Sequence, residues 1–204
     1  ITEAMLQFIE ESPTAFHAAA NVEALLLENG FEKLENLAEG ALVPGGSYYT
    51  MQNGSAVLAV KIPENPAKGF RIAASHSDSP CFKIKEVPEM KVENTYVKLN
   101  VEKYGGMILS PWLDRPLSVA GRVFVAGKDG KPEAKLVNLK KDLLIIPNVA
   151  IHFNREINNG FAYNPQTDMA PLMGLDQELS IKKLCAEAAG VAEEEILRSE
   201  EHTS

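Results

Sequence analysis

The feature that most constrains the fold is an almost continuous apolar run, residues 70–74, which ends in the polar sequence "SHSDS". Apolar runs of this length are typical of strands that are buried on both faces of a sheet. His76 and Asp78 follow the run directly, and α/β sheets bind ligands just outside the carboxyl ends of their strands. The sequence therefore predicts a buried central strand that ends in a binding site.

His76 and Asp78 together indicate a metal ligand and the carboxylate that orients it. Neutral imidazole is the commonest metal-ligating side chain. A carboxylate that accepts its second N–H fixes the tautomer and raises the basicity of the ligand. The alternative is a turn in which Ser and Asp side chains cap backbone amides. From these residues alone both interpretations stay open.

Three other polar sites have simpler explanations. His152 lies in the apolar sequence "VAIHF" and His17 in an alanine-rich helical segment, so both are explained by a packed histidine with one hydrogen bond. Asp114 and Arg115 are predicted to form a local ion pair in a charged turn, which would contribute little to stability. The sequence contains no G-x-S-x-G elbow, Walker loop, G-x-G-x-x-G or H-E-x-x-H motif.

Composition argues against two classes of partner. The net charge of −8 disfavours nucleic acid and anionic membrane surfaces, which both attract Lys/Arg patches. No apolar run approaches the roughly 20 residues that cross a bilayer. The only cysteines, Cys81 and Cys185, are far apart in the sequence and form no metal-type pair. We therefore expect a cytoplasmic protein without nucleic-acid or membrane partners.

The periodicity predicts an α/β part followed by a β-rich part. We expect helices over 2–10 and 11–31, two strands within 47–62 joined at Asn53-Gly54, and a last helix over 176–191 that ends at Gly190. Short β runs separated by turns fill the interval; they are residues 95–102, 117–127, 133–139 and 142–147. The character changes at 88–92, which predicts a boundary between residues 1–88 and 89–197.

Five segments in order then resemble one family over residues 3–197. They are "ESPTAFHAAANV", "ASHSDSPCFKIK", "SPWLDRPLSVAGRV", "IPNVAIHFNREIN" and "DMAPLMG". Together they resemble the aspartyl aminopeptidase and vacuolar aminopeptidase I family of zinc metallopeptidases. The resemblance implies the N-terminal part of an α/β/α peptidase domain (1–88), interrupted by an inserted β-rich dimerisation domain with a C-terminal helix (89–197).

The resemblance also implies chemistry and partners. It implies release of N-terminal residues, often Asp or Glu, from peptides, with two Zn²⁺ (or Co²⁺) ions per active site that activate a water. His76 matches the family's zinc-ligand histidine and Asp78 the aspartate that orients it. His152 matches a histidine placed at the neighbouring subunit's active site, where it either binds metal or contacts the substrate. Homo-oligomers, dimers that build a dodecamer through the inserted domain, are the implied assembly.

The family pattern extends beyond this chain, to a bridging Asp, paired glutamates, another Asp and a final His. We therefore expect the chain to be an N-terminal fragment that is inactive alone, with apolar surface exposed around residues 69–75. The alternative from another class is a non-catalytic assembly subunit of a dodecameric shell. A different dinuclear aminopeptidase or deacylase is disfavoured by "WLDRPLSVAGRV", which we connect only with this family.

The last seven residues, "RSEEHTS" (198–204), do not resemble the family. A common sequencing adapter, AGATCGGAAGAGCACACGTCT, translates in frame into this heptapeptide. We therefore interpret residues 198–204 as an adapter artefact, and His202 as a residue without a metal role.

Overall fold

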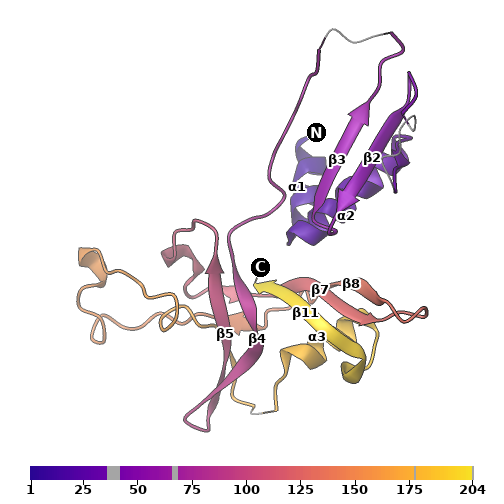
Figure 1. Cartoon of the computed structure of the whole chain (residues 1–204). Helices are drawn as coiled ribbons and strands as arrows, with labels where there is room; N and C mark the ends of the chain where they lie inside the picture. Colours follow the sequence, from indigo (N-terminus) through magenta and orange to yellow (C-terminus); the bar gives the residue numbers. More distant parts are fainter. Residues whose placement is uncertain (36–41, 66–68, 177, 204) are drawn as a thin grey trace. The chain divides into compact units, whose positions relative to one another are not determined.

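The computed structural model describes residues 1–35, 42–65, 69–176 and 178–203 (Figure 1). The chain divides into two compact units, Ile1–Ser79 and Pro80–Ser204, which we describe separately. The division falls earlier than the predicted boundary at residue 88. Pro88 lies inside β4 (Cys81–Val92), in a bulge where the register against the neighbouring strand shifts between Ile84 and Glu89. A proline that suggests a break in the sequence is thus accommodated within a strand.

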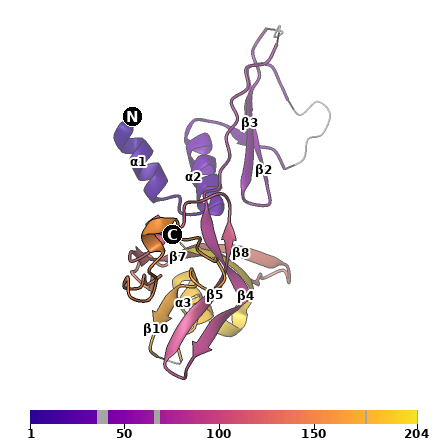
Figure 2. The ribbon, with the colours of Figure 1, turned by 90° about the vertical axis from the view of Figure 1, so that its left-hand side faces the viewer.

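The first unit contains two helices and a small sheet (Figure 2). The sheet order is β1-β2-β3, with β1 parallel to β2, and β2 antiparallel to β3. The helix α2 packs against β3. The elements are α1 (Thr2–Glu10), α2 (Ala15–Glu28), β1 (Glu32–Lys33), β2 (Ser47–Gln52) and β3 (Ala56–Lys61). The predicted helices and hairpin are therefore confirmed.

Local sequence signals explain where these elements begin and end. The Thr14 hydroxyl accepts the His17 backbone N–H at 3.4 Å, which caps the first turn of α2. Gly30 follows the helix with φ 75°, a left-handed conformation that glycine adopts without steric cost. Asn53 and Gly54, in the β2–β3 turn, also have positive φ, as their sequence predicts.

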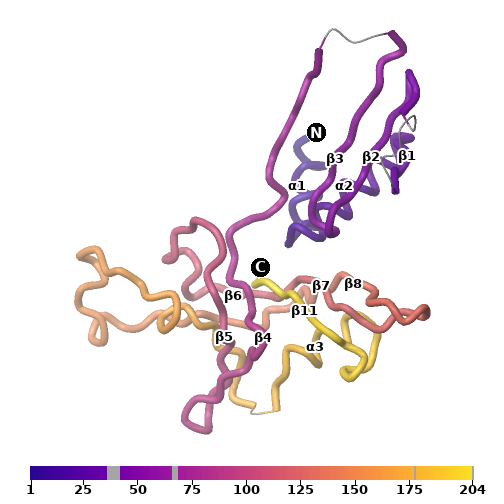
Figure 3. Tube along the Cα trace, viewed as in Figure 1, coloured from indigo at the N-terminus to yellow at the C-terminus, as the bar shows by residue number. Residues whose placement is uncertain are grey.

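The prediction of a buried strand at residues 70–74 is wrong for this structure. The segment is extended but belongs to no strand, and Figure 3 shows it as a long unpaired trace after the uncertain grey residues. Phe70 and Ile72 are 92% and 84% exposed. No strand among the described residues pairs with this backbone, so the apolar run has no sheet in which to bury its side chains. The predicted exposure of apolar surface at 69–75 is confirmed.

The second unit is an antiparallel sheet with one helix against it. Its strands follow the order β6-β9-β10-β5-β4-β11-β7-β8, and the paired neighbours are antiparallel. The predicted β runs are confirmed, and the turn between β7 and β8 contains Gly130 with a positive φ. The further strands are β5 (Tyr96–Tyr104), β6 (Pro116–Leu117), β7 (Val119–Ala126), β8 (Pro132–Asn138), β9 (Leu144–Ile145), β10 (Leu172–Gly174) and β11 (Ile196–Thr203).

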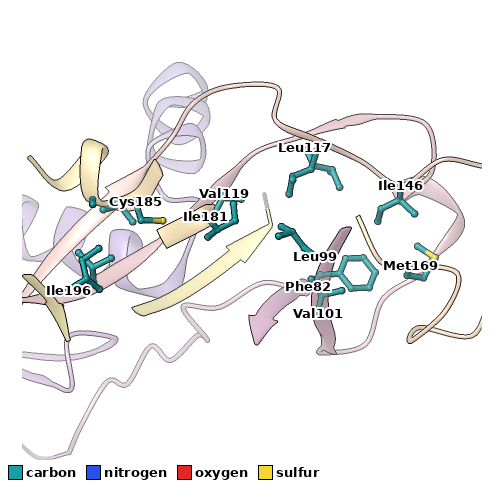
Figure 4. Close-up of a cluster of buried hydrophobic side chains, with 14 of the residues drawn as sticks. Phe82, Leu99, Val101, Leu117, Val119, Ile146, Met169, Ile181, Cys185 and Ile196 are labelled. Carbon is teal, nitrogen blue, oxygen red and sulfur yellow. The ribbon is translucent and has the colours of Figure 1, made fainter. Parts of the chain in front are cut away.

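The helix α3 (Ile181–Ala189) ends at Gly190 as predicted, but it begins at Ile181, later than the predicted residue 176. The Ser180 hydroxyl accepts the Lys183 N–H, and Gly190 closes the helix with φ 66°. Its buried face consists of Ile181, Cys185 and Ala186. These side chains join the core between helix and sheet (Figure 4), which includes the fully buried Phe82, Leu99, Val119, Val123, Ile146 and Met169. One hydrophobic core thus holds the second unit together.

The strand β11 (Ile196–Thr203) contains most of the last seven residues, which we interpreted from the sequence as an adapter artefact. It lies between β4 and β7, and its Glu201 side chain points into the unit, with only 4% of the residue exposed. The Oε1 atom of Glu201 has no hydrogen-bond partner in the described structure. Burial raises the pKa of this carboxyl, and the negative charge of Glu89 adds to the effect. A strand position that faces the core therefore holds a side chain poorly suited to it.

Candidate metal site and the loop that carries His152

His76 and Asp78 are brought together at the end of the first unit. His76 Nδ1 lies 3.0 Å from Asp78 Oδ1 and 2.8 Å from the Asp78 carbonyl oxygen. If Nδ1 donates to Asp78, the lone pair of the imidazole is on Nε2. The His76 side chain is 81% exposed, so this nitrogen is accessible to a ligand. The predicted proximity of His76 and Asp78 is therefore present, whereas the orienting role of Asp78 and the metal role of His76 stay predictions.

The segment around His76 is fastened to the β2–β3 hairpin. The Ser77 hydroxyl donates to the Ser55 carbonyl oxygen at 2.8 Å, in the turn between the two strands. A hollow of about 700 Å³ lies beside it, lined by the polar segment 75–79 and by apolar residues that include Phe8, Ile9 and Val22. The Ser77–Ser55 contact could not be predicted from a sequence motif, since it joins positions 22 residues apart.

The residues present fit one part of a metal site. An imidazole oriented by a carboxylate is a typical zinc ligand with its supporting group. However, no cluster of three or more His, Cys, Asp or Glu side chains in the described part of the chain could enclose a metal ion. His76 would thus supply a single ligand, and others would have to come from outside these residues.

His152 lies in the second unit, on a long excursion of the chain between β9 and β10 (orange in Figure 3). It is exposed, within a turn closed by the Phe153 N–H, which donates to the Ala150 carbonyl at 2.9 Å. The alternative of a packed core histidine is therefore wrong here. His17, by contrast, is half-buried and its Nδ1 lies 2.8 Å from the Thr14 hydroxyl, as expected for a structural histidine.

Asp114 differs from its predicted role. Its carboxylate does not pair with Arg115 in the described structure but accepts the backbone N–H of Asn148 at 2.8 Å. This contact fixes the start of the loop that carries His152. The sequence motif drew attention to Asp114, but a partner 34 residues away cannot be read from the motif.

The comparisons with known proteins decide the family. The sequence model of the family described as aminopeptidase I zinc metalloprotease (M18) matches residues 8–202. The chain belongs to the M18 family. A curated M18 relative, "Probable M18 family aminopeptidase 2" of Clostridium acetobutylicum, is 44% identical over 201 residues, which are 95% of this chain and 46% of the relative.

Solved structures agree with this M18 assignment. A chain in the cryo-EM structure of the Ape4 and Nbr1 complex has a TM-score of 0.89 and 32% identity, covering 98% of this chain and 42% of that one. The S. cerevisiae mApe1 dodecamer has a TM-score of 0.81 and 22% identity, covering 98% of this chain and 47% of that one. The mixed α/β fold of M18 aminopeptidases is therefore shown.

The chain spans about half the length of the curated relatives that it matches: 46% of the Clostridium acetobutylicum protein. Among the helices of the described residues, none is long and apolar enough to cross a membrane.

Proposed function

We propose that the protein to which this chain belongs is a zinc-dependent aminopeptidase that releases N-terminal residues, preferentially Asp or Glu, from peptides in the cytoplasm. The family match over residues 8–202 carries this proposal. The pairing of His76 Nδ1 with Asp78 supports it, because this geometry presents Nε2 as a ligand atom. The acidic preference comes from the resemblance alone.

In this proposal His76 holds a metal ion through Nε2, and Asp78 keeps the imidazole in the required tautomer by accepting the Nδ1 proton. Two zinc ions, when bound, would supply an activated water and polarise the scissile carbonyl, and cobalt would serve in the same way. The Ser77–Ser55 hydrogen bond keeps the ligand segment against the β2–β3 turn. His152 would act at the active site of a second subunit, on the metal or on the substrate.

The chain by itself should be inactive. A single histidine ligand cannot hold two metal ions, and no larger ligand cluster exists in the described residues. The purified chain, loaded with zinc, should release no N-terminal residue from a peptide above the rate of a blank. Release at the rate of a complete M18 enzyme would contradict this part of the proposal.

We further propose a homo-oligomer, a dimer that builds a dodecamer through the second unit. The residues around His152 support it, since Val149, Ile151 and Phe153 are 54%, 45% and 85% exposed. Apolar side chains exposed together mark surfaces that another protein covers. The structural neighbour from S. cerevisiae is itself a dodecamer. Light scattering of the complete protein would test the assembly.

We keep the adapter origin of residues 198–204 as a proposal. It is supported by the buried and incompletely bonded carboxylate of Glu201, although the family match does extend to residue 202. Recovery of the source DNA would decide it. Genomic sequence that continues past codon 197 with these same residues would refute an adapter origin.

The experiment that tests the function uses the complete gene, recovered from the same DNA. Its purified product is assayed for release of Asp, Glu and Leu from short peptides, with and without a chelator, beside a His76→Ala variant. We expect chelator-sensitive release that His76→Ala abolishes. No release from a folded, zinc-loaded oligomer would instead favour the second candidate, a non-catalytic assembly subunit.

A further inference from the structure

Asp114 has an unusual backbone conformation for its residue type. Its φ is 57°, in the left-handed region, which is uncommon outside glycine, although Asp and Asn visit it more than other residues. Such a conformation persists only where the surroundings hold it, and it is often found at functional sites. The conformation therefore raises the question of what Asp114 holds in place.

The backbone on both sides of Asp114 is fixed to the core. The Asp114 N–H donates to the carbonyl oxygen of Ile146 at 2.9 Å, and Leu113 forms a parallel bridge to Ile146. Ile146 is fully buried. Two residues before Asp114, Trp112 packs edge-on against Phe82, with ring centroids 5.1 Å apart. The backbone of Asp114 is thus anchored to the hydrophobic core on its N-terminal side and through its own N–H.

From this position the Asp114 side chain binds the backbone just after Ile146, where the chain leaves the core. After Ile146, the next residues are exposed, and Asp114 Oδ1 accepts the Asn148 N–H at 2.8 Å. The Asn148 side chain in turn accepts the Val149 N–H at 2.9 Å. The turn that displays His152 begins at the following residue, Ala150. The polar chain from Asp114 to the His152 turn is therefore continuous.

The far end of the same loop is fastened separately. Asp168 Oδ2 accepts the Asn164 N–H at 2.8 Å, and the Asp168 N–H donates to the Asn164 carbonyl at 2.9 Å. Met169, the next residue, is fully buried. Since His152 is close to the first anchor and far along the chain from the second, the orientation of its turn depends mainly on Asp114.

We propose that Asp114 is the positioning residue for His152: it orients the turn through the backbone of Asn148. The link between Asp114 and the turn rests on the geometry alone, whereas its effect on peptide hydrolysis rests on the proposed function. An Asp at this place combines an ionised acceptor for the Asn148 N–H with tolerance of the left-handed backbone. Asparagine at this position would keep a side-chain oxygen that accepts the Asn148 N–H and would tolerate the left-handed backbone. Alanine would do neither.

The first arm of the test measures amide hydrogen exchange in the 204-residue chain. In Asp114→Ala, the Asn148 and Val149 amides should exchange about tenfold faster or more, as expected on loss of a charge-assisted hydrogen bond. Asp114→Asn should restore most of the protection, and Asp142→Ala, an exposed aspartate on another loop, should change nothing. Unchanged exchange at Asn148, or equal acceleration at Val123 in the core, would overturn the proposal.

The second arm uses the complete enzyme. Asp114→Ala should lower kcat about tenfold or more with zinc content unchanged, and the double variant with His152→Ala should be no slower than His152→Ala alone. Additive losses would overturn the positioning role. A complete enzyme without peptidase activity would refute the proposed function but leave the exchange result valid, so the two failures can be distinguished.

Discussion

At the residue scale, the central observation is the pairing of His76 with Asp78. The spacing of the two residues predicted their contact, since a carboxylate two positions after a histidine can reach its ring. What the sequence could not predict is the Ser77–Ser55 contact that holds the pair against a hairpin turn. Contacts between distant residues depend on tertiary packing, which a local motif does not encode.

Asp78→Ala in the complete enzyme should weaken metal binding or activity about 10–100-fold, because the imidazole loses the acceptor that orients it. Asp78→Asn should lose less, since its amide oxygen can still accept from Nδ1. Titration with zinc followed by activity measurement checks both variants. Asp142→Ala is the matched control and should bind zinc normally; equal affinity in Asp78→Ala would contradict the orienting role.

Glu201 gives a prediction about pH. The folded state raises the pKa of this carboxyl above its ordinary value of 4.5, mainly through burial. The fold therefore favours the protonated form, and the stability of the second unit should fall as pH rises through the raised pKa. The thiol of Cys185 on α3, Ser199 on the same strand and Glu89 on β4 face this carboxyl.

Glu201→Leu should remove this dependence and raise the free energy of unfolding at pH 7 by about 1–3 kcal/mol, the cost of leaving a buried polar atom, Oε1, without a partner. Urea unfolding is measured at several pH values for the parent chain and for Glu201→Leu. The difference between the two pH profiles isolates the contribution of Glu201 from that of neighbours such as His202. The matched variant Glu200→Leu should instead destabilise, since Glu200 Oε2 accepts Arg122 Nε at 2.8 Å. Identical pH profiles for the parent chain and Glu201→Leu would refute this account.

At the element scale, caps and turns were the most predictable features. Thr14 caps α2 through its own side chain, and Asn53-Gly54 and Gly190 act through their own backbone, so these signals are local and hold in the structure. The strand predicted at 70–74 failed for the opposite reason: a strand needs a partner, and the described residues provide none. Pro88 misled in a related way, because the bulge that accommodates it depends on pairing with β5.

Gly190→Ala should lower the free energy of unfolding of the second unit by about 1 kcal/mol, since its φ of 66° disfavours any residue with a Cβ. No neighbouring atom lies within 4 Å of the added Cβ, so the effect is conformational rather than steric. Thermal or urea unfolding checks it. The free energy of unfolding of Gly190→Asn should lie between those of the parent and of Gly190→Ala. A Gly190→Ala variant as stable as the parent would contradict the role of Gly190 as a left-handed cap.

At the scale of the whole molecule, the family and the fold class were predictable because five motifs occur in order along the chain. Periodicity and composition alone gave an α/β part followed by a β-rich part but no activity. The packed environment of β11 and the anchoring of the His152 loop could not be predicted, since both depend on strands distant in sequence.

The exposed run at 70–74 predicts the behaviour of the isolated chain. Extended apolar backbone without a partner promotes association between chains. The double variant Phe70→Ser, Ile72→Ser should therefore reduce aggregation measured by light scattering. Val87→Ser, Ile108→Ser is the matched control, because these residues are 73% and 76% exposed but lie outside the run. An equal effect of both double variants would argue against a specific role of the run.

The measurement that tests the central claim most directly is the zinc content of the complete protein, determined by elemental analysis for the parent and for His76→Ala. The account predicts that the parent holds zinc at its active site and that His76→Ala loses at least one zinc ion per chain while it stays folded. An unchanged zinc content in a folded His76→Ala protein would show that the apolar run ends in a turn rather than in a metal ligand.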